Sequence, residues 1–127
     1  MKILHTSDWH LGRTFHGTSL HDVSERFIDE LIATVAEENI DAVLISGDVY
    51  DSAHPSAETT ELLGKTLDRL ALAGIQVVLS AGNHDSARRL GYGAGTLARQ
   101  GIYPVTTLKE TFEPVELIRD DIRVRIY

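Results

Sequence analysis

Three short apolar stretches, separated by two long amphipathic stretches, constrain the fold of this chain more than any other feature. Residues 2–6, 41–46 and 75–80 have the length and the aliphatic content of buried β-strands. Between them, residues 19–38 and 56–73 repeat apolar side chains at the spacing of one helix face. Strands that alternate with helices in this way predict an α/β fold built around a parallel sheet.

The apolar faces of the two long helices follow from the same spacing. The predicted core residues are Val23, Phe27, Leu31, Ile32 and Val35 in the first helix and Leu62, Leu63, Leu67 and Leu70 in the second. Further along the chain, a shorter and glycine-rich helix is predicted over residues 86–99, and a fourth strand over 102–105. Residues 112–118 and 122–127 flank a polar turn, which is typical of an antiparallel strand pair.

The composition of the 127 residues is that of one soluble domain, with 43% hydrophobic and 24% charged residues. No apolar run approaches the roughly 18–20 residues that a membrane helix requires, and cysteine is absent, so we expect a cytoplasmic protein without a membrane partner. The net charge of −7 argues against binding nucleic acid through a general basic surface. A nuclease stays possible, because carboxylates that bind metal ions add negative charge themselves.

Polar motifs follow each of the three predicted strands directly. Asp8 and His10 come after the first strand, Asp48 after the second, and Asn83 with His84 after the third. The carboxyl ends of parallel strands meet at one edge of a sheet, where ligands of α/β proteins bind. Carboxylate, imidazole and amide groups together suit Mn, Fe or Zn. The sequence therefore predicts a metal site at this edge.

Other polar residues near these motifs have more than one interpretation. Asp51 either accepts a hydrogen bond from His84 and orients it or caps a turn ahead of the second helix. Asp85 is predicted to cap the N-terminus of the third helix. We expect Trp9 to have a packing role and His5 to be buried and hydrogen-bonded rather than a metal ligand.

The motifs resemble those of the calcineurin-like metallophosphoesterases, which are Asp-x-His, Gly-Asp-x-x-Asp and Gly-Asn-His-Asp/Glu. More narrowly, His5-Thr-Ser-Asp-Trp-His-Leu-Gly12 is similar to the opening of SbcD-type nuclease subunits, as is Gly47-Asp-Val-Tyr-Asp-Ser-Ala-His-Pro-Ser56 to their second motif. The resemblance covers essentially the whole chain. It implies the N-terminal portion of an αββα sandwich, with a parallel βαβαβ unit followed by a helix and short antiparallel strands.

The resemblance also implies a role for each motif residue and a pair of divalent ions, for which the family points to Mn²⁺. Asp8 and His10 would bind the first ion, Asp48 would bridge both, and Asn83 would bind the second. His84 would contact the scissile phosphate and stabilise the transition state or protonate the leaving oxygen. The two ions together would activate a water for in-line attack on a phosphodiester.

In function, the resemblance implies a 3′-to-5′ exonuclease and endonuclease acting on DNA ends and hairpins in double-strand-break processing, and so a role in DNA repair, recombination and replication. One alternative is a metallophosphoesterase for a small phosphodiester or a phosphoprotein. The other alternative is a non-catalytic dimerisation or interaction module. Substrate assays separate the first pair, and a Mn²⁺ titration identifies the module.

The expected partners follow from the same resemblance. They are DNA, a coiled-coil ATPase of the SbcC type, and a second copy of the chain that binds through residues 56–73 and 86–99. Arg13, Arg88 and Arg89 lie next to the motifs and are candidates for DNA contacts, although a solvated surface role is equally compatible with each one.

One part of the family pattern is missing from the chain. The family completes its two metal sites with three further histidines in Gly-His and Gly-His-x-His motifs, and no histidine follows His84. We therefore expect the chain to be the N-terminal part of a metallophosphoesterase domain. Alone, it is expected to bind metal weakly and to have little or no nuclease activity.

Overall fold

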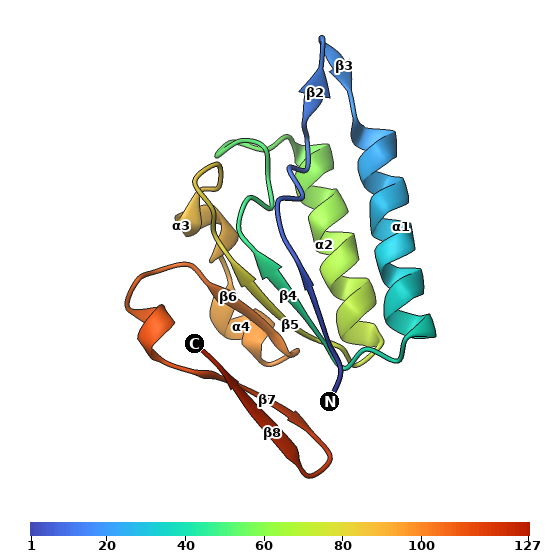
Figure 1. The fold of residues 1–127 in the computed structure, drawn as a ribbon. Helices are drawn as coiled ribbons and strands as arrows, with labels where there is room; N and C mark the ends of the chain where they lie inside the picture. Colours follow the sequence, from blue (N-terminus) through green and yellow to red (C-terminus); the bar gives the residue numbers. More distant parts are fainter.

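A four-stranded parallel sheet lies at the centre of the protein. The computed structural model describes all of residues 1–127. Neighbouring strands follow the chain order β1-β4-β5-β6 (Figure 1), and their bounds are Ile3–Thr6, Ala42–Ser46, Gln76–Ser80 and Ile102–Val105. The four predicted strands and the α/β class are therefore confirmed.

Two long helices, α1 (His21–Glu37) and α2 (Ala57–Leu72), cover the same face of this sheet (Figure 1). Each connection moves the chain one strand further in the same direction, and right-handed crossovers then place the helices on one face. Ser56 begins α2, since its side-chain oxygen accepts a hydrogen bond from the Thr59 N–H at 3.1 Å. No helix has the length and hydropathy needed to cross a membrane.

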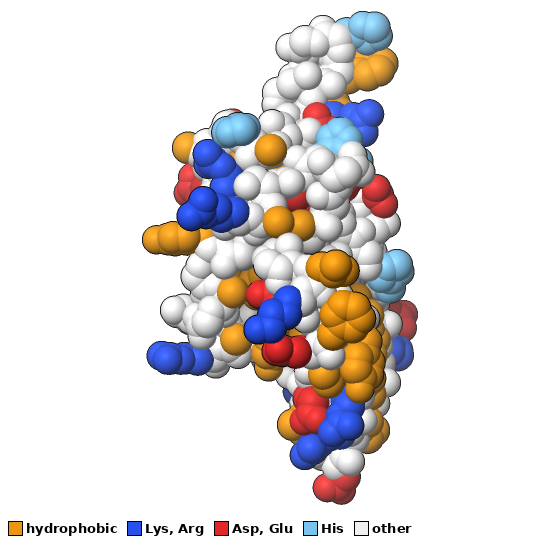
Figure 2. Space-filling view, turned by 90° about the vertical axis from the view of Figure 1, so that its left-hand side faces the viewer, with side chains coloured by type: hydrophobic (Ala, Val, Ile, Leu, Met, Phe, Trp, Pro, Cys, Tyr) orange, Lys and Arg blue, Asp and Glu red, His pale blue; other side chains and the backbone are white.

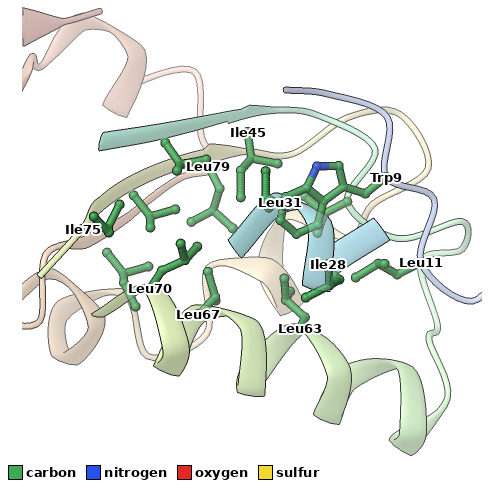
Figure 3. Packing of buried hydrophobic residues seen from close by; sticks show 14 of the residues in the cluster. Trp9, Leu11, Ile28, Leu31, Ile45, Leu63, Leu67, Leu70, Ile75 and Leu79 are labelled. Atoms are coloured by element: carbon green, nitrogen blue, oxygen red, sulfur yellow. The ribbon is translucent and has the colours of Figure 1, made fainter. Parts of the chain in front are cut away.

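The main core fills the space between the sheet and these helices (Figure 3). It contains Leu63, Leu67 and Leu70, as predicted for α2, whereas α1 differs from its prediction. The predicted Val23 is 55% exposed and Ile28 is 1% exposed, so the buried α1 residues are Ile28, Leu31 and Val35. The first turn of α1 lies beyond the strand ends (Figure 1), where no sheet is available to cover it.

Trp9 has the packing role expected of it. Its ring is 8% exposed and meets Phe27 edge-on, with 5.5 Å between the ring centroids. The indole N–H donates to the Thr6 hydroxyl oxygen at 3.1 Å, so its one polar group is satisfied. Phe27, placed by prediction on the buried face of α1, is 38% exposed and covers the edge of this tryptophan.

An antiparallel hairpin packs on the face of the sheet opposite the helices. Its strands are β7 (Val115–Arg119) and β8 (Ile122–Ile126), which confirms the predicted pair. Leu117 is fully buried against Ala42 and Val78 of the sheet. The predicted strand start at residue 112 is wrong, because Glu110–Phe112 form a 3₁₀ turn, η1.

The predicted helix over residues 86–99 is two short helices, α3 (Ala87–Leu90) and α4 (Ala94–Ala98). Gly93 lies between them with φ of +75°, a left-handed conformation that ends a regular helix. A second difference is the small hairpin of β2 (Thr14–Phe15) and β3 (Thr18–Ser19), which was not predicted from the sequence. Its two central residues, His16 and Gly17, both have positive φ, as tight hairpin turns of type I′ require.

Candidate metal centre

Three loops meet at the carboxyl edge of the parallel sheet. They are the first motif loop (residues 7–11), the second (47–51) and the third (81–85), which follow β1, β4 and β5. The first and second loops extend the strand pairing past the strand ends through backbone hydrogen bonds: His10 N to Asp48 O at 2.9 Å, Leu11 N to Val49 O at 2.9 Å and Asp51 N to Leu11 O at 3.0 Å. Backbone pairing therefore fixes the register of the first two motifs.

The third motif loop is held by the carboxylate of Asp85. One oxygen accepts from Val49 N at 3.1 Å and Gly82 N at 2.9 Å, and the other accepts from Tyr50 N at 2.8 Å. The prediction that Asp85 caps the third helix is wrong, because Ser86 occupies that position. Asp85 joins two loops that lie 35 residues apart in the chain, a contact that local sequence does not reveal.

The Asp85→Ala variant is expected to lower the free energy of unfolding by about 2–4 kcal/mol, because three backbone N–H groups lose a charged acceptor. Urea denaturation measures the change. Asp121→Ala is the matched control, since that side chain lies in the exposed β7–β8 turn and is expected to change stability by no more than about 0.5 kcal/mol. Equal stability of the two variants would contradict the role of Asp85.

His10, Asp48 and His84 form the centre of the site. Their potential ligand atoms all lie within 4.8 Å of one another. His10 Nε2 is 3.8 Å from Asp48 Oδ2 and 3.9 Å from Asp8 Oδ1. The other Asp48 oxygen, Oδ1, accepts from the His84 backbone N–H at 3.0 Å. Asp48 thus joins the second and third loops and also presents an oxygen to the site.

Three of these residues adopt an unusual backbone conformation. Asp8, His10 and Asp48 have φ values of +54°, +45° and +45°, in the left-handed region that is uncommon for residues other than glycine. Such strain gathers at functional sites, where the surrounding structure enforces it. Here it turns the carboxylates and the imidazole toward one another at the ends of their strands.

Asp51 contacts both histidines, through different atoms. Its carboxylate Oδ1 lies 3.1 Å from His10 Nδ1, whereas its backbone carbonyl oxygen lies 2.9 Å from His84 Nδ1. Of the two interpretations of Asp51, the contact with His84 is therefore present, but it involves the main chain. The His10 and His84 rings meet edge-on at 4.9 Å between centroids.

The remaining predicted residues lie around this centre. Asn83 is exposed on the third loop and outside the His10–Asp48–His84 cluster. Arg13 is exposed, with its Nε 4.0 Å from Asp51 Oδ1, and Arg88 and Arg89 are exposed on α3. His5 is exposed rather than buried as predicted, although it is hydrogen-bonded to the Ser46 hydroxyl at 2.9 Å.

The motifs and their geometry agree with a comparison of the sequence against known protein families. The profile of the family described as calcineurin-like phosphoesterase matches residues 1–124. The chain belongs to the calcineurin-like phosphoesterase family. The parallel sheet and its helices are consistent with the N-terminal part of this fold.

Curated relatives place the similarity within this phosphoesterase family more closely. The chain is 38% identical over 118 residues to a protein of Staphylococcus saprophyticus named as the SbcD subunit of the SbcCD nuclease, which covers 92% of this chain and 31% of the relative. It is 35% identical to the protein of the same name in Staphylococcus epidermidis, over 92% of this chain and 32% of that relative. The predicted resemblance to SbcD-type proteins is confirmed, and the chain spans about a third of their length.

The phosphoesterase family implies divalent metal ions, and the donors in this chain fit them. Ligand atoms lie about 2.0–2.2 Å from a bound transition-metal ion, so two ligands of one ion are roughly 3–4 Å apart. The separations from His10 Nε2 to the Asp8 and Asp48 oxygens are in this range. His10 Nδ1 is buried without a hydrogen bond, which leaves the orientation of this ring dependent on Asp51 and on what Nε2 binds.

The surroundings of His84 favour its protonated form. Its hydrogen bond to the Asp51 carbonyl raises the pKa of the imidazole, and the negative charges of Asp48 and Asp51 raise it further, while Arg13 lowers it. Since Nδ1 faces that carbonyl, Nε2 is the nitrogen left to donate to a phosphate oxygen.

In the metal-free phosphoesterase chain, the His84 pKa measured by NMR titration is therefore expected to lie above 6.5. A raised pKa means that protonation favours the folded state. This contribution to stability is complete below the unfolded-state pKa near 6.5 and is lost as the pH rises through the folded-state pKa. Arg13→Gln removes the one opposing charge and is expected to raise the His84 pKa further; a fall would contradict the assignment of causes.

Proposed function

We propose that this chain provides the N-terminal half of a two-metal DNA nuclease site of the SbcD type. The observation that carries the proposal is the cluster of His10, Asp48 and His84, which three separate motif loops bring within 4.8 Å. The similarity to proteins named as the SbcD subunit of the SbcCD nuclease supports DNA as the substrate.

In this proposal each motif residue has one task. Asp8 and His10 hold the first divalent ion, Asp48 bridges both ions, and Asn83 contributes to the second. Bound ions, proposed to be Mn²⁺, would supply polarisation of the phosphodiester and activation of the attacking water. His84 donates from Nε2 to the scissile phosphate, and its raised pKa keeps the proton available for that contact.

Several parts of the site are proposed to come from outside this chain. Since the chain spans about a third of its relatives, we propose that it is the N-terminal part of the phosphoesterase domain and that further histidine ligands complete both metal sites. The 127 residues alone are then expected to bind Mn²⁺ weakly and to cleave little DNA. Robust Mn²⁺-dependent cleavage by this purified chain would contradict that expectation.

The partners are proposals of the same kind. Exposed Arg13, Arg88 and Arg89 at the metal edge would contact phosphates of DNA. The name of the relatives supports a complex with an SbcC-type coiled-coil ATPase, with which the chain would act on DNA ends and hairpins in the cytoplasm during break processing. A homodimer would use the surface of α2 and α4, which a measurement of molar mass by light scattering tests directly.

The decisive experiment compares substrates in the presence of Mn²⁺, using the protein that the gene encodes. Labelled linear DNA, hairpin DNA and bis(p-nitrophenyl) phosphate are the substrates. We expect DNA to be cleaved, mainly from 3′ ends and at hairpins, and His84→Gln to slow cleavage by about 10²–10⁴-fold. Asp68→Asn, on the exposed side of α2, is the control and should leave the rate unchanged.

The same assay separates the alternatives. Hydrolysis of the small phosphodiester without cleavage of DNA would favour a metallophosphoesterase for small substrates. Absence of both activities together with absence of Mn²⁺ binding would favour a non-catalytic interaction module.

A further inference from the structure

A cleft lined by two arginines and two tyrosines lies beside the metal edge. It has a volume of about 490 Å³ and is lined by Tyr50, Pro55, Thr60, Arg88, Arg89 and Tyr92. Tyr50 directly precedes Asp51, and its backbone N–H donates to Asp85 at 2.8 Å. The cleft is therefore continuous with the second and third motif loops, and what binds in it would extend toward the metal centre.

The charge of this cleft differs from that of the rest of the protein. The net charge is −7, and most arginines elsewhere are neutralised, as Arg69 is by Asp29 at 2.7 Å and Arg119 by Asp41 at 3.3 Å. Arg88 and Arg89 are exposed and make no ion pair. Figure 2 shows basic side chains gathered next to a histidine near the upper end of the visible face. Two free guanidinium groups side by side favour a ligand with more than one negative charge.

The two tyrosines of the cleft are in opposite situations. Tyr50 is 7% exposed and forms part of the fixed wall, whereas Tyr92 is 87% exposed. The backbone beside Tyr92 is nonetheless held in place: a Cβ on Gly91 would collide with the Thr106 side chain, and Tyr92 N donates to Arg89 O at 3.1 Å. Tyr92 is thus a large aromatic ring on a defined backbone that presents its face to solvent next to two positive charges.

We propose that this cleft binds unpaired nucleotides at the end of a nucleic-acid strand, with Arg88 and Arg89 on the phosphates and Tyr92 stacked on a base. A basic groove combined with an exposed aromatic ring is the usual means of holding single strands, because every base has a face to stack. The inference rests on the proposed nuclease function and adds to it a preference for frayed or single-stranded ends. A second copy of the chain is a poorer occupant, because a two-fold contact would bring the arginine pairs of both copies together.

The test is equilibrium binding of fluorescent DNA to the full chain without divalent ions, so that nothing is cleaved. One probe is a single strand with 2-aminopurine near its 3′ end, and the other is a blunt duplex of the same length. We expect Tyr92→Ala to weaken single-strand binding by about 5- to 150-fold and to remove the quenching of 2-aminopurine. Tyr92→Phe keeps the stacking face and should restore both.

The arginine variant provides the matched comparison. Arg88→Gln with Arg89→Gln should weaken both probes and reduce the salt dependence of binding by up to about two units of slope. Tyr92→Ala should leave blunt-duplex binding almost unchanged. Because Tyr92 is exposed, circular dichroism and the melting temperature of this variant should match the wild type.

Three outcomes would overturn the inference: unchanged single-strand binding in Tyr92→Ala, an equal loss for both probes, or a change only in the monomer–dimer equilibrium. If the variant binds normally while the wild type cleaves DNA, this inference fails and the nuclease function stands. If the wild type shows the stacking signal but the gene-encoded protein cleaves no DNA with Mn²⁺, the cleft stands and the nuclease function fails.

Discussion

The Asp48→Asn variant is expected to bind Mn²⁺ at least about 100-fold more weakly than the wild-type chain. Residues that only orient a metal ligand contribute about 10–100-fold to metal affinity, and Asp48 faces the site directly, with Oδ2 3.8 Å from His10 Nε2. Asparagine removes the charge but tolerates the positive φ of this position. Its amide oxygen also keeps an acceptor for the His84 backbone N–H. Calorimetric or paramagnetic NMR titration with Mn²⁺ measures the change.

The control for this prediction is Asp68→Asn, which removes the same charge from the exposed side of α2, away from the motif loops. Its Mn²⁺ affinity should equal that of the wild type. Equal affinities for the Asp48 and Asp68 variants would mean that Mn²⁺ binds elsewhere and that the cluster is not a metal site.

The Gly82→Ala variant is expected to lose at least about 3 kcal/mol of stability and the motif geometry with it, because overpacking of this kind is costly. A Cβ at Gly82 would overlap both the Asp48 side-chain oxygen Oδ1 and the Asp48 backbone nitrogen. The backbone of Asp48 cannot move aside easily, because Gly47 also approaches Gly82, and a Cβ there would lie 3.2 Å from the Gly82 Cα. Chemical denaturation gives the stability, and the Mn²⁺ titration reports on the site.

The chain offers a glycine-to-alanine control of opposite sign. Gly64 lies within α2, and a Cβ there would meet nothing within 4 Å. Gly64→Ala should therefore raise stability by about 0.5–1 kcal/mol through helix propensity. A Gly82→Ala variant as stable as Gly64→Ala would show that the second and third loops are not packed as closely as described.

The elements that sequence predicted well are those whose periodicity is set by burial. The strands β1, β4, β5 and β6 and the long helices α1 and α2 each pack one apolar face, so their patterns follow directly from the core. The first turn of α1 shows the limit of this reasoning. Val23 has the correct spacing, but it extends past the sheet, and the spacing alone does not reveal where the neighbouring element ends.

The broken helix illustrates a second limit. Three glycines between residues 91 and 95 indicated a weak helix, but only the left-handed conformation of Gly93 decides that α3 and α4 are separate. That break places Tyr92 between the two helices, beside Arg88 and Arg89. The sequence singled out the arginines, whereas the cleft that joins them to Tyr50 and Tyr92 depends on tertiary packing.

The candidate site was predictable to the extent that it depends on topology. Parallel strands deliver their following loops to one edge, so the proximity of His10, Asp48 and His84 follows from the strand assignments. The roles of Asp85 and Asp51 were not predictable in the same way. Asp85 acts on backbone groups 35 and 36 residues away, and Asp51 uses its carbonyl oxygen toward His84, so neither contact has a local signature.

The strand order β1-β4-β5-β6 has a consequence for how the site forms during folding. Each of these strands pairs with the one that precedes it in the same sheet, so every loop that must close is short, as the Asp48–His84 separation of 36 residues shows. Because the entropy of closure grows only slowly with loop length, each pairing event has a similar, modest barrier. The metal-binding edge is therefore expected to grow one motif at a time as the sheet is extended, with no separate search for its ligands after the sheet is complete.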